Sequence, residues 1–351
     1  IGMMPDGAVS WKLGRIPPQG KKSFNLSICA ATTLKGVKKL VQKLQKADIV
    51  KEYANTEKYW LDVLKEAIKV QTSNPQVDAL YKRTVLVFKL MADKGSGGLL
   101  AAPEIDEGFT RCGRYAYCWG RDAAFITGAL DRCGLNAAVD KFYAWAVEVQ
   151  DEEGSWQQRY HMDGNLAPSW GLQIDETGTL LWGMLEHYKT TKSRKFLENV
   201  WISVEKGAEF LRSFVDEDTG LPKPSYDLWE ERMGEHAYST AAVCGGIKAA
   251  VEIARILDKG HDKLPLWEKA WLDMKVAMER NFWKEDRGCF LRSVRTKLNP
   301  WGSEYSQNTT VIQVNPKGYC RDVTLEDGMV DISLLGVAIP FEIFDVDDPR
   351  V

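Results

Sequence analysis

The stretch Asp216-Glu-Asp-Thr-Gly-Leu-Pro-Lys-Pro-Ser-Tyr-Asp227 decides the fold, because its pattern recurs along the chain. A helical pattern ends, an acidic turn closes on Gly220, and a short extended run comes next. The same succession occurs at Gly98, Gly154 and Gly288, so the steps between the four glycines are 56, 66 and 68 residues. Each step has room for two helices, which is the spacing of stacked helical hairpins.

Apolar residues at helical spacing fill the segments around these turns. They predict helices over residues 37–44, 60–68, 76–93, 122–132, 136–150, 176–190, 196–215, 237–257, 263–282 and 328–342. Because almost no strand-like alternation interrupts the series, we expect a mainly α protein. Helical pairs with long loops on one side favour a ring of hairpins, and an irregular α domain is the alternative.

The first 35 residues have a different pattern. Residues 9–14 and 23–29 alternate or nearly alternate in polarity, with Pro17 and Pro18 between them, which predicts two short strands. Two strands cannot bury a core of their own. We therefore expect residues 1–35 to be the remnant of a larger sheet domain or an arm packed on the helical part of the chain.

The composition is that of a globular protein and disfavours several function classes. Hydrophobic residues make up 44% and charged residues 27% of the 351, and the net charge of -3 disfavours a nucleic-acid partner. No apolar stretch reaches about 18 residues, so no membrane span is expected. The seven cysteines are scattered without a CxxC pair, which favours a cytoplasmic over a secreted setting. Neither the compartment nor the oligomeric state can be read from the sequence.

Aromatic and charged residues gather in the extended runs. Tyr115, Trp119, Arg121 and Asp122 stand together just before a predicted helix. Arg121 offers a planar fork of donors and Asp122 accepts, so the pair is suited to hold adjacent sugar hydroxyls. The structural alternative is that Asp122 caps the helix and pairs with Arg121 on the surface.

Trp170 precedes the helix predicted over residues 176–190, which Asp175 or Thr177 could cap. Its indole is suited to form the flat wall of a sugar site and to offer its N–H to a hydroxyl. The alternative is that Trp170 belongs to the core.

Glu230 and Glu231 come directly after Trp229. Two adjacent carboxylates usually mark a solvated loop or the start of a helix. A carboxyl group beside an apolar ring, with further carboxylates nearby, should instead have a raised pKa. A general acid that works at neutral pH needs such a pKa.

No pattern indicates a metal or a cofactor, and we expect neither. The four histidines form no HExxH motif, and the acidic turn at residues 216–220 lacks the EF-hand positions. Neither a Walker A motif nor a strand-linked GxGxxG occurs.

Four motifs, in this order, resemble the glucoamylase-like family of glycoside hydrolases. They are Tyr-x-Tyr-x-Trp-x-Arg-Asp at 115–122, Gln-Asp-Glu-Glu-Gly-Ser-Trp at 150–156, Ser-Trp-Gly-x-Gln-x-Asp at 169–175 and Tyr-Asp-Leu-Trp-Glu-Glu at 226–231. The last is the most specific, and the resemblance covers about residues 95–351. It is strongest to the bacterial branch, which includes glucodextranases and some trehalases.

The resemblance implies an incomplete (α/α)6 barrel over residues 76–351, linker helices over 36–75 and the remnant of an N-terminal β-sandwich domain over 1–35. It implies an enzyme that releases glucose, with inversion, from the non-reducing end of α-glucans or α-gluco-oligosaccharides. Whether the linkage is α-1,4, α-1,6 or α,α-1,1 stays open. The alternatives are a non-catalytic glucan-binding or regulatory module of this fold, and an (α/α) disaccharide phosphorylase.

By resemblance, Glu230 is the general acid. The residues that bind the sugar are Tyr115, Trp119, Arg121, Asp122, Trp170, Trp229 and Glu231.

The family's general base is a Glu in a Ser-Glu-Glu/Gln-Tyr-like stretch. Ser303-Glu304-Tyr305 is superficially similar, but it precedes the last predicted helix and lacks the family's continuation. Asp331 falls within that predicted helix. We therefore expect the base to lie beyond Val351, so that the chain is C-terminally incomplete and inactive by itself.

Overall fold

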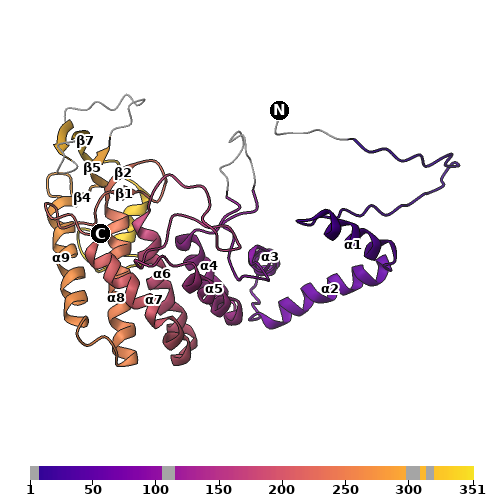
Figure 1. Ribbon diagram of the computed structural model, residues 1–351, viewed down its shortest axis with the longest axis horizontal. Helices are drawn as coiled ribbons and strands as arrows, with labels where there is room; N and C mark the ends of the chain where they lie inside the picture. Colours follow the sequence, from indigo (N-terminus) through magenta and orange to yellow (C-terminus); the bar gives the residue numbers. More distant parts are fainter. Residues whose placement is uncertain (1–7, 105–114, 298–308, 314–319) are drawn as a thin grey trace. The chain divides into compact units, whose positions relative to one another are not determined.

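A computed structural model describes residues 8–104, 115–297, 309–313 and 320–351 (Figure 1). The chain divides into two compact units, Ile1–Leu61 and Asp62–Val351. In the part that the structure describes, no helix has the length and apolar character needed to cross a membrane.

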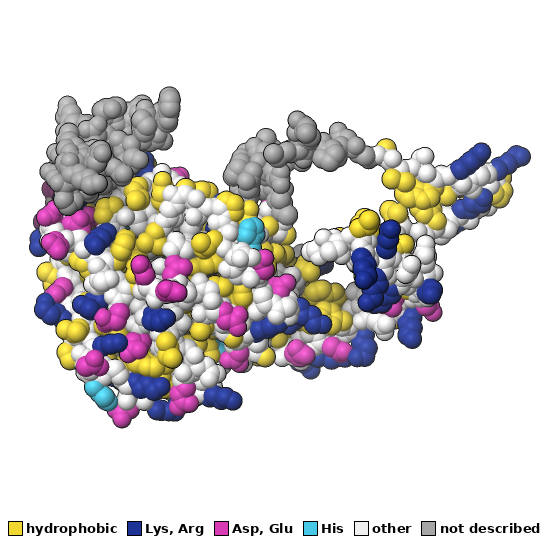
Figure 2. Space-filling model, in the orientation of Figure 1, with side chains coloured by type: hydrophobic (Ala, Val, Ile, Leu, Met, Phe, Trp, Pro, Cys, Tyr) yellow, Lys and Arg dark blue, Asp and Glu magenta, His cyan; other side chains and the backbone are white. Residues whose placement is uncertain are grey.

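The first unit contains helix α1 (Leu34–Gln45) and most of helix α2 (Ile49–Glu66). The Thr33 hydroxyl caps α1 by accepting a hydrogen bond from Gly36 N at 3.1 Å. Figure 2 shows Lys and Arg side chains gathered over this unit, whereas acidic and basic side chains are interspersed on the visible face of the second unit.

The two strands predicted within residues 9–29 are wrong for this structure. The described backbone of residues 8–33 contains no strand, although the rings of Trp11 and Phe24 lie with centroids 5.4 Å apart. A strand needs a hydrogen-bonded neighbour, and an isolated pair of strands is marginal in water. Alternating polarity therefore did not suffice to form a sheet here.

The second unit is built from two rows of helices. α4 (Gly120–Arg132), α6 (Ile174–Thr191) and α8 (Ala237–Leu257) pack side by side in that order. α5 (Asn136–Glu148), α7 (Arg194–Ser213) and α9 (Leu264–Phe282) pack in the same order as a second row, and α3 (Pro75–Met91) contacts α4. These bounds confirm the helices predicted between residues 76 and 282 and the mainly α, hairpin-based fold.

Helix α8 lies at the centre of the core, and most of its side chains are buried. It touches α6 with almost no side chain between the two backbones. A Cβ added at Gly178 would lie 2.3 Å from Ala242 O, and one at Gly246 would lie 2.6 Å from Gly178 O. Glycine at both positions therefore allows the closest approach in this row.

The predicted repeat is a repeated turn. In the first three turns a glycine N–H closes the turn on an aspartate carbonyl, and each glycine has a positive φ. The pairs are Gly97 to Asp93 at 3.0 Å, Gly154 to Asp151 at 2.9 Å and Gly220 to Asp216 at 2.8 Å. The first of them uses Gly97 and not Gly98, because the closing hydrogen bond falls one residue earlier.

Each of these turns packs against the next helix of the second row. A Cβ at Gly97 would lie 2.7 Å from Lys141 O of α5, and one at Gly154 would lie 2.3 Å from Lys206 O of α7. One at Gly220 would lie 3.2 Å from Ala277 Cβ of α9. The recurring glycines therefore join successive hairpins.

The predicted helix over residues 328–342 is wrong. It is replaced by a 3-10 helix, η1 (Ile332–Val337), which Asp331 caps from outside. Pro340 lacks a backbone N–H and disfavours the α conformation at Ile339, so an α-helix cannot continue there.

A small antiparallel sheet, absent from our expectation, lies next to the helices. Its order is β1 (Ser225–Tyr226), β2 (Met233–His236), β5 (Ser293–Lys297), β7 (Cys320–Asp327) and β6 (Thr309–Gln313). A separate hairpin pairs β3 (Trp283–Lys284) with β4 (Cys289–Phe290). The runs of β-branched residues in β5 and β6 were the available signal.

Candidate active site

The predicted site residues come from the start of α4 and the segment before it, from the segment that leads into α6 and from the loop between β1 and β2. The first turns of α4 and α6 meet, since Arg121 of α4 contacts Asp175 and Glu176 of α6. The N-terminal ends of α4 and α6 therefore form one face of the site.

Arg121 is largely buried and faces α6. Its Nη1 lies 2.7 Å from Asp175 Oδ2, 3.0 Å from Gln173 Oε1 and 3.1 Å from Glu176 Oε1. Its backbone N–H donates to Glu176 Oε2 at 2.6 Å. Burial, together with the charges of Asp175 and Asp122, raises the pKa of Glu176 well above its usual range despite Arg121.

Asp122 borders the same cluster but stays accessible. Its side chain is 41% exposed and lies 3.5 Å from Arg121 Nη2. Partial burial raises the pKa of Asp122, and the negative charges of Asp175 and Glu230 add to the rise, which Arg121 partly offsets. Asp122 and Glu230 are therefore within electrostatic reach of each other.

The segment 227–232 is the loop of the β1–β2 hairpin, which we call the acid loop. Buried Asp227 closes it, because its Oδ1 accepts hydrogen bonds from Glu231 N at 2.8 Å and Arg232 N at 3.0 Å. Glu230 N donates to Asp227 O at 2.9 Å. Glu230 itself has a φ of +61°, which is uncommon for a residue with a side chain.

Glu230 points toward the start of α4. Its Oε1 accepts a hydrogen bond from Trp119 Nε1 at 2.7 Å. Trp119 is 3% exposed and stands two positions before Arg121. The acid loop and the Arg121–Asp122 pair are thereby brought to one place.

Aromatic rings surround Arg159 beside this contact. Its guanidinium carbon lies 4.6 Å from the ring centroid of Trp170, 4.8 Å from that of Tyr117 and 5.2 Å from that of Trp119. Tyr115 lies with its ring centroid 6.0 Å from that of Trp119. Trp170 and Tyr115 are about half exposed, so each can offer a ring face to a ligand.

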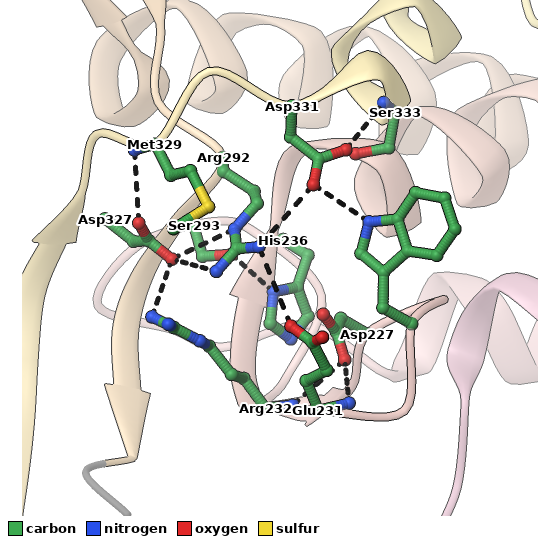
Figure 3. Close-up of polar contacts among 11 residues, drawn as sticks. Asp227, Glu231, Arg232, His236, Arg292, Ser293, Asp327, Met329, Asp331 and Ser333 are labelled. Atoms are coloured by element: carbon green, nitrogen blue, oxygen red, sulfur yellow. Dashed lines mark hydrogen bonds and ion pairs between the residues drawn. The ribbon is translucent and has the colours of Figure 1, made fainter. Parts of the chain in front are cut away.

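Charged side chains hold the other side of the acid loop (Figure 3). Trp229 Nε1 donates to Asp331 Oδ2 at 2.9 Å. Arg292 Nη2 lies 2.6 Å from Asp327 Oδ2, and its Nη1 lies 3.5 Å from Asp331 Oδ2 and 3.9 Å from Glu231 Oε2.

The structure thus brings the predicted residues together around Trp119 and the acid loop. The capping alternatives are wrong. Trp119 and Gln173 occupy the N-cap positions of α4 and α6, neither with a side-chain cap, and Thr177 instead accepts from Trp156 N at 3.0 Å. Asp175 instead forms an ion pair with Arg121.

Sequence reasoning missed several residues that complete the site. They are Arg159, Gln173, Glu176, Arg292, Asp327 and the position of Asp331. Gln173 and Glu176 stand in the segment that was singled out for Trp170, so that segment was the available signal. Ser303-Glu304-Tyr305 lies outside the described residues. Within the described residues no cluster of three or more His, Cys, Asp or Glu side chains is arranged to hold a metal.

Comparison with solved structures shows a shared fold. A bacterial glucoamylase solved with acarbose matches with a TM-score of 0.64 and 18% identity, covering 89% of this chain and 45% of that one. A glycosidase variant solved with glucose matches with a TM-score of 0.57 and 21% identity, covering 77% of this chain and 66% of that one. These likenesses confirm the helical-barrel fold with a small sheet part.

Comparison with curated proteins extends to the whole chain. A glycosyl hydrolase of Methanocaldococcus jannaschii, named as uncharacterized, is 29% identical over 358 aligned residues, covering 100% of this chain and 51% of the relative. A protein named trehalase 2, of Sulfolobus acidocaldarius, is 22% identical, covering 63% of this chain and 42% of the relative. The chain thus spans about half the length of these relatives.

The family model described as glycosyl hydrolases family 15 matches residues 76–346, which include every motif of the site described above. Since this match spans most of the chain, the protein belongs to glycosyl hydrolases family 15.

Proposed function

We propose that the chain carries the acid half of an exo-acting, inverting glycoside hydrolase that releases glucose from the non-reducing end of α-glucans or α-gluco-oligosaccharides. In this proposal Glu230 is the general acid, which protonates the leaving glycosidic oxygen. The observation that carries it is the 2.7 Å hydrogen bond between Trp119 Nε1 and Glu230 Oε1. It directs this carboxyl group toward the start of α4, where Arg121 and Asp122 lie.

The surrounding residues have roles that suit a terminal glucose. Asp122 is accessible, so its carboxylate can accept hydrogen bonds from sugar hydroxyls. Asp175 and Glu176 hold Arg121 through Nη1, so its Nη2, which lies 3.5 Å from Asp122, is preorganised beside that carboxylate. Trp170 and Tyr115 offer half-exposed rings as walls.

Further residues complete the proposed sugar site around the cleaved bond. Tyr115 and Trp119 line the glucose pocket, and Trp170 and Glu231 contact the sugar beside the cleaved bond. Trp229 also belongs to the proposed sugar-binding residues. Glu231 is exposed within the acid loop, and its carboxylate lies 3.9 Å from Arg292 Nη1.

Inversion also needs a general base, a second carboxylate about 6.5–9.5 Å from the acid, with a water molecule between them. The proposal places that base outside residues 1–351. The greater length of the curated relatives supports it. The test therefore uses the complete natural polypeptide that contains this sequence.

The deciding experiment measures glucose release from maltose, isomaltose and trehalose in parallel, with the anomer of the product followed by NMR. Trehalose is included because one relative is named a trehalase. The proposal expects glucose of inverted configuration from at least one substrate, without added phosphate. Release that depends on phosphate would indicate a phosphorylase, and binding of acarbose without turnover would indicate a non-catalytic glucan-binding module.

A further inference from the structure

An alternating chain of charges runs behind the acid loop (Figure 3). Arg232 Nη1 lies 3.0 Å from Asp327 Oδ2, the same oxygen that Arg292 contacts at 2.6 Å. Arg292 then reaches Asp331, which accepts the indole N–H of Trp229 at 2.9 Å. The chain begins and ends on the acid loop.

The acid loop is therefore tied at two points to one segment, residues 327–331. Arg232 anchors its end and Trp229 anchors its tip, directly before Glu230. Between these points the loop has the internal Asp227 hydrogen bonds, which fix its shape but not its orientation. Orientation depends on contacts from outside the loop, which are these two ties and the hydrogen bond from Trp119 Nε1 to Glu230 Oε1.

Among these anchors, Asp331 is the one that holds the tip of the acid loop, because it accepts the Trp229 hydrogen bond. Its two oxygens have separate tasks: Oδ1 accepts from Ser333 N at 2.7 Å and caps η1, while Oδ2 accepts from Trp229. Its side chain is 11% exposed and that of Arg292 is 6% exposed, so both charges act in a poorly solvated place, where such networks are stiff.

We propose that Asp331 is a positioning residue, which holds the Trp229 indole and thereby keeps the neighbouring Glu230 carboxyl in line with the bond to be cleaved. The inference rests on the proposed function of Glu230. Without this acceptor the indole N–H turns to water and the tip can rotate. Misplacement of a reacting group by about 1 Å costs about 100-fold in rate, so kcat should fall about 10- to 100-fold, a larger factor than any rise in KM.

The variant Asp331→Ser separates positioning from capping. Serine is a good helix N-cap, so η1 keeps its cap, but its side chain is too short to reach Trp229. Trp229→Phe removes the same hydrogen bond from the other side and keeps an apolar ring. The matched control is Asp345→Ser, because Asp345 also accepts a backbone N–H two residues on, at 3.1 Å from Asp347 N, outside the acid loop.

The first measurement is independent of activity. The protein is labelled with 15N-tryptophan, and the Trp229 indole signal is identified by its loss in Trp229→Phe. We expect Asp331→Ser to move that indole proton signal upfield and to speed its exchange with solvent, with no change in Asp345→Ser. An unmoved signal in Asp331→Ser overturns the inference about Asp331 and leaves the proposed function of Glu230 unaffected.

The second measurement is turnover by the complete natural polypeptide. We expect Asp331→Ser and the double variant with Trp229→Phe to lose kcat to a similar extent, since both remove one shared contact. A shifted indole signal with wild-type kcat overturns the positioning role. Wild-type turnover in Glu230→Gln would instead overturn the proposed function, and the indole result distinguishes the two failures.

Discussion

At the scale of single residues, Glu230 combines an unusual backbone with an unusual partner. A φ of +61° at a non-glycine residue costs about 1–3 kcal/mol and persists only where the surroundings impose it. Asp227 and Trp119 are those surroundings. The sequence singled out Glu230 through its neighbour Trp229, but Trp119 stands 111 positions away and no local pattern links the two.

Replacing Glu230 by Gln tests the acid at this scale. The amide is isosteric with the carboxyl group but cannot give up a proton, so turnover by the complete natural polypeptide should fall about 10²- to 10⁴-fold. The urea midpoint should stay close to that of the wild type. Glu217→Gln, an exposed position in a repeat turn, is the control, and equal turnover in the two variants would contradict the assignment.

Glu235 on β2 makes a pH-dependent contribution to stability. Its side chain is 0% exposed and lies 3.1 Å from Arg295 Nη1. Burial, with the nearby charges of Asp216 and Asp218, raises its pKa from 4.5 to about 7 despite Arg295. Between these values the folded state binds more protons than the unfolded state, so stability falls as pH rises from about 4.5 to 7.

Glu235→Gln should remove this dependence. Through this window the variant should lose less stability than the wild type, by up to about 3 kcal/mol. Urea unfolding at pH 5 and pH 8 measures the difference. Parallel pH profiles of the two proteins would show that Glu235 does not titrate in this range.

At the scale of elements, the turn after a second-row helix packs against the next helix of that row. It thereby joins one helical hairpin to the following one. Gly154 has a φ of +102°, and a Cβ there would lie 2.3 Å from Lys206 O of α7. The acidic-glycine spacing was readable in the sequence because a left-handed turn demands glycine. Its contact with α7 was not readable, since it depends on how the hairpins stack.

Gly154→Ala should therefore destabilise the protein by about 2–4 kcal/mol, through both backbone strain and the clash. Gly288→Ala is the matched control. Gly288 has a φ of +59°, and among the described residues a Cβ there meets no atom within 4 Å. That variant should lose only about 1 kcal/mol. Equal urea midpoints for the two variants would contradict a packing role for Gly154.

At the scale of the whole molecule, Arg121 belongs both to the candidate site and to the buried core. This side chain joins the first turns of α4 and α6, and it is the cation nearest to two fully buried carboxylates, Asp175 and Glu176. An uncompensated buried charge is among the most destabilising changes in a protein. The proposed sugar-binding pair, Arg121 and Asp122, and the packing of the first row therefore cannot be changed separately.

Arg121→Met should destabilise the second unit by about 3–5 kcal/mol at neutral pH. The loss arises because two buried carboxyl groups, Asp175 and Glu176, lose the side chain that contacts both of them. Arg194→Met is the control, since Arg194 forms an exposed pair with Glu198, worth about 0–1 kcal/mol. Thermal unfolding at neutral pH distinguishes the two variants, and equal melting temperatures would contradict this account.

The sequence by itself determined the features that local physics controls. The period of apolar residues placed α3 to α9, and the acidic-glycine turns marked the hairpin repeat, because helix periodicity and positive φ are properties of a few neighbouring residues. It also singled out Glu230, Arg121 and Asp122 by chemistry. It failed at residues 9–29 and at the sheet, where pairing between distant segments decides. At residues 328–342 it failed although Pro340 was a local signal against a continuous helix.

The tertiary structure alone decided which residues meet. Trp119 reaches Glu230, Arg159 stacks against three rings, and Asp331 takes the indole of Trp229 across 102 positions. Such contacts arise from the stacking of hairpins around α8, and their partners are set by geometry over the whole unit. The pattern of residues along the sequence does not reveal that geometry, because side chains far apart in the chain share no period.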